Sequence, residues 1–169
     1  ELTPDARLRG LYLRHALDEQ RHAEMFRGRG AELLRAHRGT AGWQPDWLAP
    51  GERGLDDVRV ERDRDAPLLA FLHLSEAAAA SSFGTYRKAV AGDAETQGMF
   101  ARILRDEAFH MNYTRHELGR VAPQKQGWIL WKARLNRLWK GYLRFAVTLG
   151  RLMGGILLLG IVAWPLLPV

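Results

Sequence analysis

Apolar side chains recur every three or four positions near the start of the chain. Thr3-Pro4-Asp5 supplies a helix-capping hydroxyl, a proline suited to the first helical position and an acidic residue for the first turn. Apart from a few glycines, nothing interrupts a helix from there to about Arg35. The pattern predicts one long helix with Leu8, Leu11, Tyr12, His15, Glu19, His22 and Phe26 on a shared face.

The same spacing returns in the middle of the chain and predicts two more helices. One runs from about Asp63 or Asp65 to Ala91, and the next from about Ala94 to Val121. Only Gly92-Asp93 separates them, so these two helices must pack antiparallel. The predicted inner faces carry Leu69, Leu72, His73, Glu76, Ala80 and Phe83 on the first helix, and Ile103, Glu107, His110, Thr114 and Leu118 on the second.

Residues 38–62 lack this pattern and are rich in glycine and proline. The stretch is too long for a tight turn between neighbouring helices, so we expect a long connection there. Three predicted helices with no strand pattern, together with abundant Ala, Leu and Arg, indicate an all-α protein.

The end of the chain has a different character. After Pro123 comes a basic, tryptophan-rich amphipathic segment, and Leu152–Val169 contains no charged residue. We therefore expect a helical domain over residues 1–122 and a membrane-associated segment over residues 123–169. A buried C-terminal helix and an anchor lying in the membrane interface are the alternatives to a full membrane span.

Composition narrows the possible chemistry. The 169 residues include no cysteine, which excludes disulfides, thiolate metal sites and cysteine nucleophiles. The net charge is +6, but the basic residues are scattered except beside the apolar tail. We therefore expect membrane lipid rather than nucleic acid as the partner, with the folded domain on the cytoplasmic side of the plasma (inner) membrane.

One short motif occurs twice. Asp18-Glu19-Gln20-Arg21-His22 and Asp106-Glu107-Ala108-Phe109-His110 both read Asp-Glu-x-x-His, each on the apolar face of a predicted helix. Glutamate and histidine three positions apart lie one turn apart on the same face, so both can ligate one metal ion. In a chain of this composition, the probability that two such copies arise by chance is roughly one in several thousand. A buried ion pair could explain one copy, but it does not easily explain two.

A pair of such helices needs further carboxylates from neighbouring helices to hold two metal ions. Glu76 lies on the predicted inner face of the intervening helix, among Leu72, Leu74 and Phe83. It is therefore the expected third carboxylate ligand. The alternative is an ion pair of Glu76 with Arg87 or His73.

The order Glu-x-x-His, Glu, Glu-x-x-His over residues 4–121 resembles the ferritin-like di-iron carboxylate superfamily. The resemblance implies a ferritin-like four-helix bundle, in which the 38–62 connection is the crossover between helical hairpins. It also implies that Asp18 and Asp106 accept the N–H groups of ligating histidines, as in bacterial multicomponent monooxygenases. The family's first helix, with its glutamate, has no counterpart here, and we expect it upstream or from another chain.

The expected metal ligands are Glu19, His22, Glu76, Glu107 and His110. His15 and His73 lie one turn from two of these glutamates, and we expect them around the site as satisfied inner-face histidines. Extra ligands or proton relays are the alternative roles for both. With oxygen and imidazole donors, two iron ions are favoured, and manganese or a mixed pair would fit the same set.

The resemblance and the apolar tail together favour a membrane-tethered di-iron oxidase or hydroxylase that uses O₂, and the tail favours a lipid-like or quinone-like substrate. Because no cysteine is present, electrons must come from an external reductase, a quinol or the substrate. The alternatives are a peroxide-reducing or iron-handling ferritin-like protein, and a non-catalytic, metal-stabilised scaffold of a membrane complex. The sequence leaves the oligomeric state open.

Overall fold

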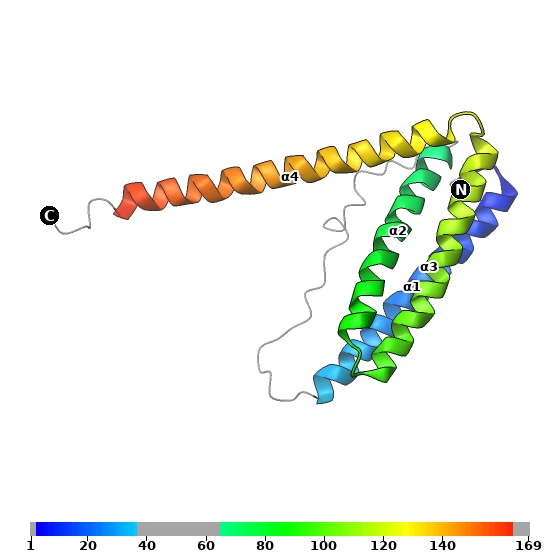
Figure 1. The fold of residues 1–169 in the computed structure, drawn as a ribbon, viewed down its shortest axis with the longest axis horizontal. Helices are drawn as coiled ribbons and strands as arrows, with labels where there is room; N and C mark the ends of the chain where they lie inside the picture. Colours follow the sequence, from blue (N-terminus) through cyan, green and yellow to red (C-terminus); the bar gives the residue numbers. More distant parts are fainter. Residues whose placement is uncertain (1–2, 37–64, 164–169) are drawn as a thin grey trace. The chain divides into compact units, whose positions relative to one another are not determined.

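The computed structural model describes residues 3–36 and 65–163, and that part of the chain is helical without any strand. Its helices are α1 (Ala6–Ala36), α2 (Asp65–Ala89), α3 (Ala94–Val121) and α4 (Gln126–Ala163) (Figure 1). The all-α prediction is confirmed over these ranges. The predicted 38–62 connection lies outside the described residues.

The start of α1 differs from the predicted one. Asp5, rather than Thr3, caps the helix: its Oδ1 accepts the backbone N–H groups of Arg7 and Leu8 at 2.9 and 3.2 Å. Thr3 instead donates its hydroxyl to Asp65 Oδ2 at 2.7 Å. The sequence pattern places Asp5 in the first turn. Its carboxylate is a stronger acceptor than the Thr3 hydroxyl, however, and so Asp5 takes the capping position.

The turn between α2 and α3 lies where the Gly92-Asp93 pair predicts it. Asp93 is the N-cap of α3, and its side chain accepts the backbone N–H of Thr96 at 3.0 Å. Helix α3 has the bounds that the sequence predicts, whereas α2 ends at Ala89, two residues earlier than expected. The chain then needs only a short turn to reverse direction.

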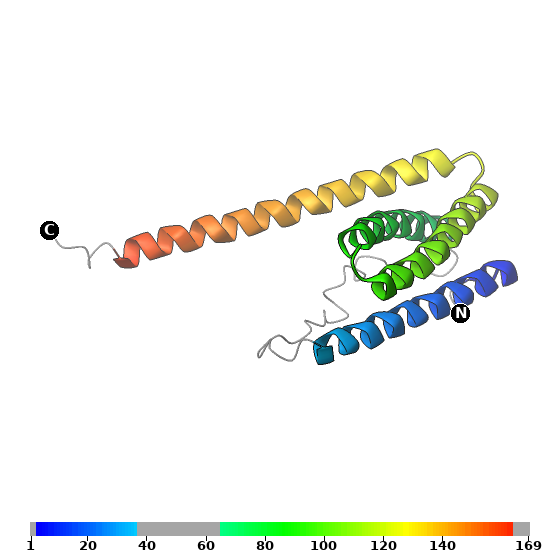
Figure 2. The same ribbon diagram turned by 60° about the horizontal axis from the view of Figure 1, so that its bottom comes forward.

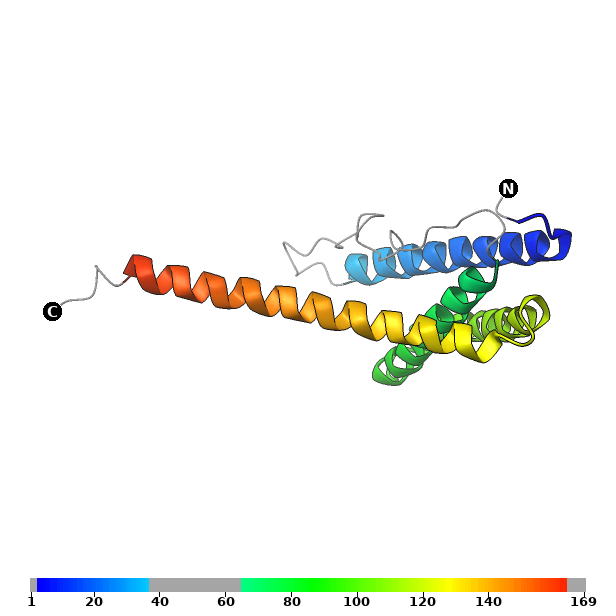
Figure 3. The ribbon, with the colours of Figure 1, turned by 90° about the horizontal axis from the view of Figure 1, so that it is seen from above.

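Helices α1, α2 and α3 lie side by side (Figures 1 and 2). Arg7 near the start of α1 pairs with Glu117 near the end of α3, and Arg29 near the end of α1 pairs with Asp93. Helix α3 is therefore antiparallel to α1, and through the tight corner also to α2. Helices α1 and α2 consequently run parallel, with α2 oblique to α1 in the view from above (Figure 3).

The interior of this three-helix unit has apolar ends and a polar middle. Met99, Phe100 and Ile103 form a buried cluster against Phe26 and Phe83 towards one end. Leu8, Leu69 and Leu118 are fully buried towards the other. The level between them contains the buried polar side chains His15, Asp18, His22, Glu76, Glu107, His110 and Thr114. Such groups are costly to bury without partners, so this layer is the candidate site.

The chain divides into two compact units, Glu1–Ile129 and Leu130–Val169. Most of the 38-residue helix α4 belongs to the second unit. Within residues 3–36 and 65–163, no helix is both long and apolar enough to cross a membrane. The charge-free run Leu152–Val169 continues past the last described residue.

Candidate metal centre

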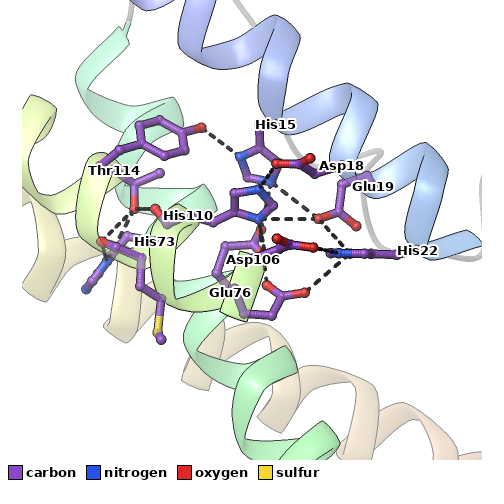
Figure 4. A network of polar contacts seen from close by, with 12 residues as sticks. His15, Asp18, Glu19, His22, His73, Glu76, Asp106, His110 and Thr114 are labelled. Atoms are coloured by element: carbon purple, nitrogen blue, oxygen red, sulfur yellow. Dashed lines mark hydrogen bonds and ion pairs between the residues drawn. The ribbon is translucent and has the colours of Figure 1, made fainter. Parts of the chain in front are cut away.

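Three helices contribute carboxylates and imidazoles to the polar layer (Figure 4). On α1, His15, Glu19 and His22 lie four and three positions apart and so share one face. Helix α3 supplies Glu107 and His110 with the same three-residue spacing, and α2 supplies Glu76. The helical periodicity that places these side chains on the inner faces of their helices also directs them towards one another.

The donor atoms converge in two groups whose members lie within 4.8 Å of one another. The first group is His15, Glu19, Glu76 and His110, and the second is Glu19, His22 and Glu107. Glu19 belongs to both groups, as a carboxylate shared by two metal ions would. The structure thus brings together all the ligands that the sequence predicted and adds His15.

The separations around His22 Nδ1 and His110 Nδ1 are longer than direct hydrogen bonds and suit metal ions. His110 Nδ1 lies 3.6 Å from Glu19 Oε1 and 3.8 Å from Glu107 Oε2. His22 Nδ1 lies 3.7 Å from an oxygen of Glu19 and 3.7 Å from one of Glu107. Two donors each bonded to one ion at about 2.1 Å are separated by roughly 3–4 Å.

Three donor atoms in this layer are buried without a hydrogen-bond partner. Among the described residues they are His22 Nδ1, His110 Nδ1 and Glu107 Oε2. An unpaired buried polar atom costs about 1–3 kcal/mol, so three together at one point indicate a missing partner. All three belong to expected ligands, and a metal ion would satisfy them. The donor set therefore fits the metal pair.

The two aspartates hold the imidazoles in the orientation that metal binding needs. Asp106 Oδ2 lies 3.0 Å from His22 Nε2, and Asp18 Oδ2 lies 3.2 Å from His110 Nε2. If each Nε2–H donates to its aspartate, the Nδ1 lone pair faces the carboxylates. The pairs are crossed: each motif's aspartate orients the other motif's histidine.

Arg21 connects the two aspartates, a role that the sequence analysis missed. Its Nη2 donates to Asp18 Oδ1 at 2.7 Å and to Asp106 Oδ2 at 2.9 Å. The signal was present, since Arg21 follows Asp18 by three positions and therefore shares its face. One guanidinium thus fixes both carboxylates that fix the histidines.

His15 lies in the centre of the layer rather than around it. Its Nε2 is 3.3 Å from Glu76 Oε1 and 3.5 Å from Glu19 Oε1. On the other side of the ring, Nδ1 is 2.7 Å from the Tyr113 hydroxyl. The ring also stacks on His110, with centroids 3.8 Å apart.

His73, expected near the site, belongs to neither converging group. Its Nδ1 lies 3.1 Å from the backbone carbonyl oxygen of Met111 on α3. For Glu76, the sequence offered Arg87 or His73 as alternative partners, but the partner in the structure is His15. His73 therefore connects α2 to the backbone of α3.

Burial and mutual charge shift the pKa values of the cluster. Burial, followed by the neighbouring Glu76 carboxylate, raises the pKa of Glu107 to about 9. Burial alone would lower the pKa of His15, but hydrogen bonds to Glu19 and Glu76 raise it to about 9. For Glu19, burial is outweighed by His15 and His22, which lower the pKa to about 2. At neutral pH, protons on Glu107 and His15 thus offset part of the carboxylate charge.

Among residues 3–36 and 65–163, the layer is open on one side. Glu19 is 48% exposed, whereas the other expected ligands are buried. A groove of about 600 Å³ between α1 and α2 reaches His15, Glu19 and Glu76. Its other walls are largely apolar and include Phe26, Phe71, Leu72 and Phe83. A small apolar molecule could therefore approach the converging donors from this side.

No protein-family model matches the chain, and no curated protein or solved structure matches it either. The assignment of function therefore rests on the residues and their geometry.

Proposed function

We propose that this protein is a ferritin-like di-iron carboxylate oxidoreductase that uses O₂ to oxidise or hydroxylate an apolar substrate. The observation that supports the proposal most directly is the set of three orphaned donor atoms, on His22, Glu107 and His110. They face two converging groups of donors that share Glu19. The parallel course of α1 and α2, each antiparallel to α3, also agrees with a ferritin-like bundle.

The chemistry of the donors favours iron. Carboxylate oxygen and imidazole nitrogen, without thiolate, suit iron or manganese, and both fit the carboxylate-rich groups. A bound pair of iron ions would pass electrons to O₂, which protein side chains cannot do, and a donor would have to reduce the irons again after each turnover. Because the chain has no cysteine, we propose an external reductase or a quinol as the electron donor.

The protein's own residues would position the donors and hold protons. Asp18, Asp106 and Arg21 fix the imidazole orientations through the contacts described above. Glu107, with its raised pKa, holds a proton on its carboxyl group near neutral pH. Ion binding at Glu107 would release this proton, so metal affinity should rise with pH.

The groove between α1 and α2 suggests the class of substrate. Three aromatic rings, those of Phe26, Phe71 and Phe83, line it beside the polar edge formed by Glu19. Apolar walls leading to a few convergent polar groups are typical of small-molecule sites. A lipid-like or quinone-like molecule matches this lining better than a sugar or nucleotide would.

We further propose that α4 associates with the cytoplasmic surface of a membrane. Leu138, Trp139, Tyr142 and Phe145 are among its exposed apolar side chains, each more than half exposed. Basic residues precede them at Lys132, Arg134 and Arg137, and Lys140 lies between Trp139 and Tyr142. Aromatic and basic side chains on one helix favour binding at an anionic lipid interface.

Metal loading followed by oxygen consumption tests this function. Purified protein reconstituted anaerobically with Fe(II) should bind two ions per chain and develop near-UV absorption on exposure to air. It should then consume O₂ when a quinol is supplied. Glu107→Gln should abolish both properties, whereas Glu24→Gln, on the exposed face of α1, should not.

Other outcomes would favour the alternatives. Rapid peroxide consumption without quinol-dependent O₂ uptake would indicate a peroxide-reducing protein. Two tightly bound zinc ions, with no spectral response to iron and air, would indicate a metal-stabilised scaffold. A wild-type chain that binds no metal would contradict the proposal altogether.

A further inference from the structure

We infer that His15 is itself a metal ligand, through Nε2, at the position that it shares with Glu19, Glu76 and His110. The inference rests on the metal centre proposed above and assigns it a third histidine. The sequence left His15 as a satisfied inner-face residue. Its contacts in the structure indicate a direct role.

The first argument is distance. His15 Nε2 lies 3.3 Å from Glu76 Oε1 and 3.5 Å from Glu19 Oε1. His110 Nδ1 lies 3.6 Å from the same Glu19 oxygen. These separations fall within the roughly 3–4 Å expected between donors on one ion. An ion at this point would therefore bond to His15 without any large movement of the ring.

The second argument is the way in which the ring is held. His22 and His110 each have one nitrogen against an aspartate and the other facing the carboxylates. His15 follows the same plan, with Nδ1 at 2.7 Å from the Tyr113 hydroxyl. A phenol oxygen can accept the Nδ1–H, which leaves the Nε2 lone pair available to a metal ion.

The third argument is packing. The rings of His15 and His110 stack 3.8 Å apart with an interplanar angle of 13°. This stack places the inward nitrogens of both rings within 3.6 Å of Glu19 Oε1. Both rings are buried, at 6% and 0% exposure. The pair therefore forms one rigid wall of the site.

His15 makes the two metal positions unequal. Among the described residues, the position that includes it has four protein donors, whereas the position with His22 and Glu107 has three when Glu19 is counted in both. With His15, the three helices α1, α2 and α3 supply six donor residues. We therefore expect the four-donor position to bind its ion more tightly and to fill first.

The experiment compares His15→Ala with His73→Ala in the full chain. His73 is a matched control because it is also an inner-face histidine but belongs to neither converging group, and its Nδ1 lies 3.1 Å from the Met111 carbonyl oxygen and 3.4 Å from the Thr114 hydroxyl. Co(II) is titrated into each protein, and affinity and stoichiometry are read from its visible absorption. We expect His15→Ala to lower the affinity for one of the two Co(II) ions at least tenfold and to change the absorption spectrum of that ion. His73→Ala should match wild type.

A second variant separates ligation from folding. His15→Gly leaves a space in which free imidazole can replace the lost ring. Addition of imidazole to the cobalt-loaded variant should restore the wild-type spectrum, and circular dichroism should show the same helicity throughout.

Two results would overturn the inference. One is a His15→Ala protein that binds both ions with wild-type affinity and spectrum. The other is a folded His15→Gly protein whose cobalt spectrum does not respond to imidazole. A wild-type chain that binds no cobalt, iron or manganese would instead contradict the proposed function, so the two failures are distinguishable.

Discussion

Each aspartate of the repeated motif contacts the histidine of the opposite motif. Asp18 holds His110 and Asp106 holds His22, at 3.2 and 3.0 Å. A carboxylate in this position fixes the ring and increases its basicity as a ligand. The two halves of the site therefore depend on each other at the level of single hydrogen bonds.

Replacing Asp18 with asparagine should weaken metal binding without removing a ligand. The amide keeps the size of the side chain but loses the charge that favours the His110 Nε2–H. Loss of such a partner typically lowers metal affinity about 10–100-fold. Competition with a chromophoric chelator measures the change, with Glu24→Gln as the surface control. Equal affinities of Asp18→Asn and wild type would contradict the assigned role.

The metal-free protein should become less stable as the pH rises from about 6.5 to 9. In the folded state, Glu107 and His15 keep their protons up to about pH 9. In the unfolded chain they lose them near pH 4.3 and 6.5, at about the ordinary values for these groups. The folded state thus binds more protons in this interval, so the free energy of unfolding decreases with pH.

Urea denaturation in the presence of a chelator measures this trend. In Glu107→Gln the contribution of Glu107 is absent, so the dependence on pH should be shallower. A metal-free stability that rises between pH 6.5 and 9 would contradict the prediction.

At the scale of elements, ion pairs fix α1 against α3 on both sides of the metal layer. Arg29 is only 16% exposed and connects α1 to the start of α3 through Asp93, Thr96 and Glu95. At the other side, the buried carboxylate of Glu117 pairs with Arg7. Between these two points, the Asp-Glu-x-x-His motif of α1 is held beside the Asp-Glu-x-x-His motif of α3.

Replacing Arg29 with methionine should destabilise the protein by clearly more than the same change at Arg27. The change removes several charge-assisted hydrogen bonds at 2.7–2.8 Å and leaves the Asp93 cap without its cationic partner. Chemical denaturation measures the loss. Arg27→Met, on the exposed side of the same helix, is the matched control and should change stability by less than about 0.5 kcal/mol. Similar losses for both variants would contradict the role of Arg29.

The sequence predicted the elements better than their contacts. Spacing and the Gly92-Asp93 break were sufficient for the bounds of α3, because these signals are local. The residues expected as ligands come together in the structure, because each lies on the inner face of its helix. The crossed aspartates, Arg21 and the central place of His15 were not predicted. These depend on how α1 is rotated and shifted against α3, which helical spacing does not determine.

At the scale of the whole molecule, the chain separates the candidate site from its basic, aromatic helix. All the converging donors lie in the unit Glu1–Ile129, whereas most of α4 lies in Leu130–Val169. The proposed metal chemistry and the proposed membrane binding therefore belong to different parts of the chain.

A chain shortened to residues 1–129 should retain metal binding and lose membrane binding. It keeps every donor and the contacts of α1, α2 and α3, so two Co(II) ions should bind with affinity within about threefold of the full chain. The full chain should sediment with anionic vesicles, and the shortened chain should stay in solution. Equal sedimentation of both chains would contradict the assignment of lipid binding to α4.

The crossed pairs also give the centre an approximate two-fold symmetry. Rotation about an axis perpendicular to the antiparallel helices α1 and α3 would exchange Asp18 with Asp106 and His22 with His110. His15, three positions before Asp18, would be exchanged with Ile103, three positions before Asp106, and here the symmetry fails. An imidazole faces one half of the site, and a fully buried aliphatic side chain occupies the equivalent place in the other. If two different metal ions were supplied together, each would therefore prefer one of the two positions instead of being distributed between them at random.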